Sequence, residues 1–393
     1  MTQEEQVRES TARPRKIEWR PLISYTGADR KAIYLSKGSK MIRCKNNIAA
    51  PIVILISSLI LVGGGGLFHL YASSPASSGY HLSKTIPLGG AGQWDYCLVD
   101  KDARRLYVSH GTEVVVVNVD SGEKVGTIPD TPGVHGIALA QDLGRGFTSN
   151  GRADSVTIFD LKTLETINTL KINGHNPDAI YYDAASKRVF TFNGRSKDVT
   201  AINAGDGSVV GNFGVGGKPE FAAGAGDGHI FVNIEDTSEL LEIDAQKLGV
   251  LHRWPLAPCK EPSGLAMDIK NRRLFSVCGN NIMVVVNAET GKVVATPKID
   301  EDPDAAGFDP ETRLVFSSNG ESGNLTVIQQ DSSDKYTVLE NVPSKKYART
   351  MAIDEKTHNI FLPIADFEAT AAAGEHRPKT KPDTFGILLV TKQ

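Results

Sequence analysis

Charged side chains recur at one equivalent place in successive segments of the chain, at the expected start of a short strand. Four of them are carboxylates and one is an arginine. If the carboxylates converge, they raise one another's pKa or hold a cation between them. The alternative is that each carboxylate caps its own loop. Together with one aromatic residue and three loop histidines, the candidate binding residues are Trp94, Asp95, His110, His135, His175, Asp178, Glu220, Asp304 and Arg349.

The three histidines, His110, His135 and His175, belong to adjacent segments of the same kind. Imidazole changes charge near neutral pH and binds metals, so they are candidate general bases or metal ligands. Solvated loop positions are the alternative. Signatures of serine hydrolases, zinc proteases, phosphate loops and dinucleotide-binding folds have no supporting context in this sequence. We therefore name no catalytic residue, no cofactor and no metal.

Four cysteines are present, without a CxxC pair and without histidine at zinc-ligand spacing. A structural zinc site is therefore not expected. Cys259 and Cys278 are expected at the same face of one repeat unit, where they can pair in an oxidising compartment. Two free buried thiols are the alternative. Cys97 is expected in the core.

Repeat units of about forty residues must position all these side chains. One aromatic residue marks each unit, at spacings of 40, 43, 41, 44, 41 and 45 residues. Each unit predicts four short strands, and the 38 Gly and 19 Pro favour the tight turns of an all-β fold. The marking residues are Tyr107, Phe147, Phe190, Phe231, Phe275, Phe316 and Phe361.

Two further sets of polar residues are predicted to form turns. A carboxylate seven residues before the repeat aromatic can accept backbone N–H groups in a hairpin. This first set contains Asp100, Asp183, Asp268, Asp309 and Asp354. The second set is expected to begin the turn between the third and fourth strands, and it contains Asp120, Asp160, Asn203, Asp244 and Asn287.

The two ends of the repeat region indicate a closed ring. The last unit, from Ala348, supplies three strands and lacks a fourth, whereas residues 80–88 resemble the fourth strand of the first unit. Pairing the two ends removes the open sheet edges and locks a seven-bladed β-propeller over residues 80–393. In such a ring the candidate residues face the mouth of the central channel, which is the default binding face.

The unit D-x-x-x-x-R-[LV]-[YF]-[VST], then N-G and V-x-D-x-x-[TS]-G, resembles the YVTN β-propeller repeat. The resemblance covers roughly 80–393, and RLYV at Arg105–Val108 is its nearest single match. It implies a bacterial envelope or surface protein with a binding or scaffolding role. Related propellers include quinoprotein dehydrogenase subunits and lyases, so the resemblance is also compatible with an enzymatic function.

The N-terminal region predicts export. Residues 1–47 hold eleven Lys or Arg and five acids, a net charge of +6, and we expect them to be disordered. Residues 48–68 carry no charge, and a hydrophobic segment over 48–72 is long enough to span a bilayer with the basic side in the cytoplasm. A retained anchor and a cleaved signal are both open, because a start at Met41 gives the layout of a signal peptide. Residues 73–79 form a linker.

The formal charge of −3 gives no reason to expect nucleic acid as a partner. We expect a monomeric, non-catalytic binding or scaffold propeller in the bacterial envelope, periplasmic or extracellular, anchored through 48–72 if that segment is not cleaved. Its ligand or envelope-protein partner is unknown. The alternative is a quinone-cofactor oxidoreductase, or a lyase or lactonase, that uses the loop histidines and the channel-mouth carboxylates.

Overall fold

The structure, a computed structural model, describes residues 77–90, 92–369 and 378–393. These form seven four-stranded antiparallel sheets and one short 3-10 helix, η1 (Gln141–Leu143). The first strands of successive sheets contact one another, and the last of them contacts the first, so the sheets close into a ring. The predicted seven-bladed β-propeller is confirmed. The segment 48–72 lies outside the described residues, among which no helix is long and apolar enough to cross a membrane.

Blades 1 to 6 each take four consecutive strands, in chain order from the axis outward. Blade 1 consists of β2 (Trp94–Asp100), β3 (Arg105–His110), β4 (Glu113–Asn118) and β5 (Lys124–Ile128). Blade 2 consists of β6 (Val134–Ala140), β7 (Arg145–Asn150), β8 (Ser155–Asp160) and β9 (Thr166–Lys171). Blade 3 consists of β10 (Pro177–Asp183), β11 (Arg188–Asn193), β12 (Asp198–Asn203) and β13 (Val209–Gly214). Blade 4 consists of β14 (Pro219–Gly224), β15 (His229–Ile234), β16 (Glu239–Asp244) and β17 (Gly249–Pro255). Blade 5 consists of β18 (Pro262–Asp268), β19 (Arg273–Cys278), β20 (Ile282–Asn287) and β21 (Val293–Ala295). Blade 6 consists of β22 (Pro303–Asp309), β23 (Leu314–Asn319), β24 (Asn324–Ser332) and β25 (Lys335–Pro343).

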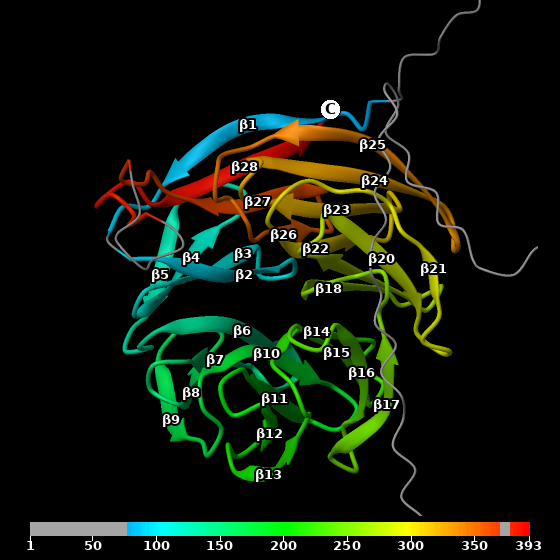
Figure 1. The fold of residues 1–393 in the computed structure, drawn as a ribbon. Helices are drawn as coiled ribbons and strands as arrows, with labels where there is room; N and C mark the ends of the chain where they lie inside the picture. The colour runs from blue at the N-terminus through cyan, green and yellow to red at the C-terminus, as the bar shows by residue number, and fades with distance from the viewer. Residues whose placement is uncertain (1–76, 91, 370–377) are drawn as a thin grey trace, which may run out of the picture. The chain divides into compact units, whose positions relative to one another are not determined.

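Blade 7 joins the two ends of the propeller. It contains β26 (Ala352–Asp354), β27 (Asn359–Ile364) and β28 (Gly386–Lys392), with β1 (Tyr80–Pro87) as its outer strand. Figure 1 shows β1 beside β28, where Tyr80 pairs with Lys392 and Pro87 with Gly386. The expected closure is therefore confirmed, and the pairing covers the edge that β28 would otherwise expose.

The repeat aromatic forms the core between blades. All seven of these side chains are fully buried in the second strands. Each meets apolar residues of a neighbouring blade, as Phe275 of blade 5 meets Phe308 of blade 6 with ring centroids 5.2 Å apart. Burying such a ring contributes about 2–3 kcal/mol per side chain. The period of about forty residues therefore arises because each blade contributes one buried aromatic residue to the core.

The first set of predicted turn residues is confirmed. Asp100 Oδ1, for example, accepts the backbone N–H groups of Asp102 and Ala103 at 3.1 and 3.0 Å. In the second set the prediction was wrong for blade 1. Asn118 accepts the N–H groups that open that turn, whereas Asp120, two residues later, binds Arg104. Asn118 and Asn287 occupy equivalent positions in their repeats, and the side-chain oxygen of each accepts backbone N–H groups of its own turn.

Tyr80 anchors the closing strand β1 to its neighbours, and replacing it tests how much this anchor stabilises the propeller. The ring of Tyr80 packs edge-on against Phe316 of blade 6 at 5.2 Å, and its hydroxyl donates to the His358 carbonyl at 2.9 Å. We expect Tyr80→Ala to lower the free energy of unfolding by about 3–5 kcal/mol, and Tyr80→Phe by about 1 kcal/mol.

Chemical denaturation of the two variants measures both losses. The exposed neighbour His81 supplies the matched control, and His81→Ala should leave the unfolding midpoint unchanged. Equal midpoints for Tyr80→Ala and the wild type would show that β1 does not lock the ring.

Candidate functional site

A bulge at the start of the inner strand in each of blades 1 to 6 aims one side chain at the axis. In blade 3, Pro177 pairs with Asn193, but the next pair along the strand is Ile180 with Thr191, so β10 carries one extra residue. Such a bulge re-aims the side chains that it contains. The same shift follows the first residue of the inner strands of blades 1 to 6. We call the residues at this place the axial ring: Asp95, His135, Asp178, Glu220, Ser263, Asp304 and, before β26, Arg349.

Arg349 holds two ring carboxylates. Its guanidinium pairs with Asp304, and it lies 3.3 Å from Asp95 Oδ1. Although burial disfavours its charge, Asp304 and Asp95 raise the pKa of Arg349 further, so it is always a cation. Ser263 adds a hydrogen bond to Asp304 Oδ1 at 2.8 Å. Blades 1, 5, 6 and 7 are thereby connected across the mouth of the channel.

His135 connects blade 2 to blades 1 and 3. Its Nδ1 lies 2.6 Å from Asp95 Oδ2 and 3.8 Å from Asp178 Oδ1. Burial lowers the pKa of His135, but the hydrogen bond to Asp95 and the charges of Asp178 and Asp95 outweigh it and raise the pKa to about 9. Burial also opposes ionisation of Asp95, yet Arg349 and His135 lower its pKa. The pair is therefore an imidazolium and a carboxylate at neutral pH.

For Asp178 and Glu220, nearby positive charge does not fully offset burial and the repulsion between carboxylates. Burial and the charge of Asp95 raise the pKa of Asp178, and burial and the charge of Asp178 raise the pKa of Glu220. Lys218 offsets part of this, because its ammonium lies 2.6 Å from Glu220 and also pairs with Glu235. Burial and mutual repulsion therefore favour the protonated form of Glu220, and this side of the ring carries less negative charge than its acids alone would give.

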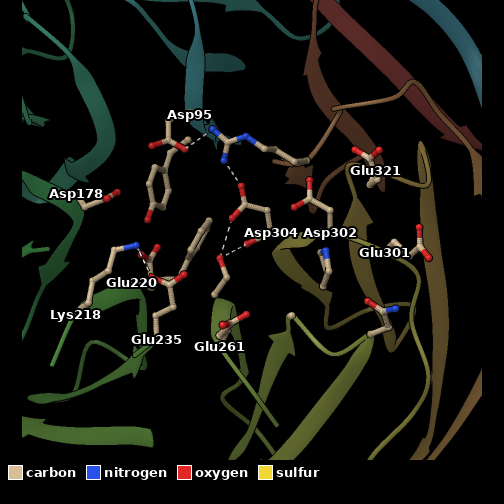
Figure 2. Close-up of a pocket in the computed structure, with 17 residues that line it drawn as sticks. Asp95, Asp178, Lys218, Glu220, Glu235, Glu261, Glu301, Asp302, Asp304 and Glu321 are labelled. Atoms are coloured by element: carbon tan, nitrogen blue, oxygen red, sulfur yellow. Dashed lines mark hydrogen bonds and ion pairs between the residues drawn. The ribbon is translucent and has the colours of Figure 1, made fainter. Parts of the chain in front are cut away.

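An acidic cavity of about 620 Å³ opens at this face. Figure 2 shows its carboxylates arranged around the space, with Lys218 at one side. Nine carboxylates and two cations, Lys218 and Arg349, line it. The carboxylates are those of Asp95, Asp178, Glu220, Glu235, Glu261, Glu301, Asp302, Asp304 and Glu321.

Two aromatic rings lie within the same lining. Tyr96 and Phe221 follow the axial-ring residues of blades 1 and 4, and their side chains meet at an angle of 36° with centroids 4.3 Å apart. The hydroxyl of Tyr96 is buried and has no hydrogen-bond partner among the described residues. Burial and the charge of Asp178 raise the pKa of Tyr96 well above its ordinary value, so the phenol keeps its proton.

A second cavity, of about 670 Å³, lies beside the first, over blades 1, 2 and 7. Asp95 and Arg349 line both cavities, and His135 lines the second. Arg152 and Lys379 contribute further positive charge to the second cavity. The ring residues of blades 1 and 7 therefore separate an acidic cavity from one with basic residues.

The other predicted residues lie outside the ring. Trp94 is buried against Phe367 and Phe385 and lines the second cavity with its edge. His110 stacks on Phe385 at 3.9 Å, and burial lowers the pKa of its imidazole. His175 is exposed and lies 3.0 Å from Asp154. The three candidate histidines therefore do not come together, and the potential metal ligands that cluster among the described residues are Asp95, His135 and Asp178.

Several contributors were missed in the sequence. Lys218 stands two residues before its ring residue, where the other blades carry no cation. Polar residues two places after the repeat aromatic hold the bulges: the Ser109 hydroxyl accepts the Asp95 N–H at 2.9 Å, and the Asn233 amide donates to the Ser263 carbonyl at 2.9 Å. Their repeated spacing was a usable signal.

Cys259 and Cys278 are joined by a disulfide with Cα atoms 5.4 Å apart. Glu261 and Gly279, which line the acidic cavity, lie two and one residues beyond these cysteines. The bond therefore ties together two loops of the cavity wall. Cys97 is the free cysteine among the described residues, and burial raises the pKa of its thiol.

Comparisons with known proteins detect similarity in structure but not in sequence. No protein-family model and no curated protein sequence matches the chain. Among solved structures, the RRP9 WD40 repeats match with a TM-score of 0.67 at 11% identity, over 81% of this chain and 99% of that one. U3-55K matches with 0.67 at 10% identity (80% and 99%). A chain of the Mitotic Checkpoint Complex matches with 0.66 at 13% identity (87% and 99%). At these identities the likeness is one of fold alone.

Neutralisation by Arg349 should be necessary for stability. Arg349→Met would leave the half-buried Asp304 without its cation and Asp95 with His135 alone, and we expect it to lower the free energy of unfolding by about 3 kcal/mol. Adding Asp304→Asn should restore part of that loss, because it removes the unpaired charge.

Urea denaturation of the single and double variants measures the coupling. Lys346→Met, which breaks the exposed pair with Glu321, should leave stability unchanged. A double variant less stable than Arg349→Met would contradict the proposed charge balance.

Proposed function

We propose that this chain is an exported, non-catalytic binding propeller whose channel-mouth face receives a basic segment of a partner protein. The observation that carries the proposal is the acidic cavity, where nine carboxylates face two cations in about 620 Å³. Such an excess attracts positive charge and speeds its encounter. The volume lies in the range of sites that enclose several side chains.

The distribution of the carboxylates supports a peptide rather than a single small cation. Glu220 and Glu235 lie at the Lys218 side, Glu261 follows the disulfide, and Glu301 and Glu321 lie at the blade 6 side. A ligand with several positive charges spaced along a chain can meet separate carboxylates at once. One solved structure with the same fold belongs to a multiprotein assembly, the Mitotic Checkpoint Complex, which agrees with a scaffold role.

Location in a bacterial envelope is part of the proposal. The uncharged segment 48–68 after a basic N-terminus supports export, with either anchoring or cleavage. The YVTN-like repeat supports an envelope or surface protein. The Cys259–Cys278 disulfide agrees with an oxidising compartment.

Binding of an oligolysine peptide tests the proposed function. We expect saturable binding that weakens as ionic strength rises, because salt screens the carboxylates. The double variant Glu261→Gln/Glu301→Gln should weaken it on the order of tenfold, since two rim charges are lost while the axial ring stays intact. Fluorescence anisotropy measures the affinity, with oligoglutamate of equal length as the control ligand.

The matched control is Glu123→Gln/Glu165→Gln. These exposed residues lie in the turns between third and fourth strands, at the other end of the blades, and give the same change in net charge. Equal weakening by both double variants would show that net charge, and not the cavity, attracts the peptide.

Export can be tested on the cysteines. When protein from its native cells is alkylated at lysis, mass spectrometry without reductant should find a peptide that links Cys259 to Cys278. Cys97 should react slowly in the folded chain, because it is half-buried and its pKa is raised. Alkylated thiols at both Cys259 and Cys278 would contradict an oxidising location.

A further inference from the structure

We propose that Asp95, His135 and Asp178 form a binding site for one divalent first-row transition metal ion. Their ligand atoms, one nitrogen and two carboxylate oxygens, all lie within 4.8 Å of one another. The three residues come from the bulges of three consecutive blades. This inference does not depend on the basic partner proposed above.

The donor set selects the class of metal. An imidazole nitrogen with carboxylate oxygens suits Zn²⁺ or Mn²⁺, whereas Mg²⁺ and Ca²⁺ prefer oxygen ligands alone. A site with three protein ligands leaves a coordination position for water or for a ligand. Asp95 and Asp178 face the acidic cavity, so that position would be accessible from it.

The orientation of His135 favours coordination through Nδ1. A side chain at Gly151 would lie 2.5 Å from His135 Nε2, so only glycine lets the imidazole lie against this backbone. That packing leaves Nδ1 directed at Asp95 and Asp178. Arg349 contacts the other oxygen of Asp95 and fixes that carboxylate.

A second, independent observation is the hydroxyl of Tyr96. It is buried, without a partner among the described residues, in the lining that it shares with Asp95 and Asp178. A buried polar group without a partner costs about 1–3 kcal/mol. A water bound to the metal would supply the missing hydrogen bond.

Coordination through Nδ1 displaces the proton that this nitrogen carries when it donates to Asp95. The displaced proton goes to solvent, so binding requires no redox change.

Calorimetric titration of the metal-stripped full chain with Zn²⁺ tests the site. We expect one equivalent to bind, and His135→Gln and Asp178→Asn each to weaken it by at least about tenfold. His175→Gln, which removes an exposed histidine outside the cluster, should bind as the wild type does. Co²⁺ should give a visible spectrum without a thiolate charge-transfer band, which excludes Cys97.

Circular dichroism melts check that each variant folds. If His135→Gln does not fold, Asp178→Asn decides, because it leaves the Asp95–His135 contact in place.

The proposal is overturned if the wild type shows no saturable Zn²⁺ binding, if both cluster variants bind like the wild type, or if His175→Gln loses the ion. Glu261→Gln/Glu301→Gln should keep the metal, so loss of peptide binding alone would bear on the proposed function and not on this site.

Discussion

Neutralisation of the charges that meet at the axis is the constraint on which this structure depends. A closed ring brings the first strand of every blade to one narrow channel, and a bulge in most of them turns one side chain inward. Four of the seven axial residues are carboxylates, and burying them without cations would cost several kcal/mol for each ion. Arg349, Lys218 and the imidazolium of His135 offset that cost. Each of the three contacts two carboxylates.

The same balance explains why the face is suited to binding. The internal cations are held by the ring, whereas carboxylates such as Glu261 and Glu301 stand farther out on the wall of the cavity. Negative potential therefore extends toward solvent while the ring itself stays folded. Tyr96 and Phe221 contact each other in the lining of the same cavity. The disulfide between Cys259 and Cys278 fixes two of the wall loops, so Glu261 is held in place without a ligand.

Much of this could be predicted from the sequence because the repeat gives equivalent residues equivalent places. The buried aromatic, the closing strand around Tyr80 and the axial positions all follow from a period that core packing imposes. Contacts between different repeat positions do not follow from that period. Lys218 occupies a place where the other blades carry no cation, and the Tyr96–Phe221 contact joins blades that are distant in sequence. Asp120 was misassigned because the turn in blade 1 begins two residues earlier, at Asn118.

The protonation of His135 tests the charge balance most directly. Nitrogen-15 NMR of the imidazole in the metal-free chain reports whether both ring nitrogens carry protons. The account predicts an imidazolium that persists above the ordinary pKa of 6.5 and loses its proton only as the pH rises through about 9. A neutral imidazole throughout the interval from 6.5 to 9 would contradict it, because the carboxylates of Asp95 and Asp178 would then lack the cation that joins them.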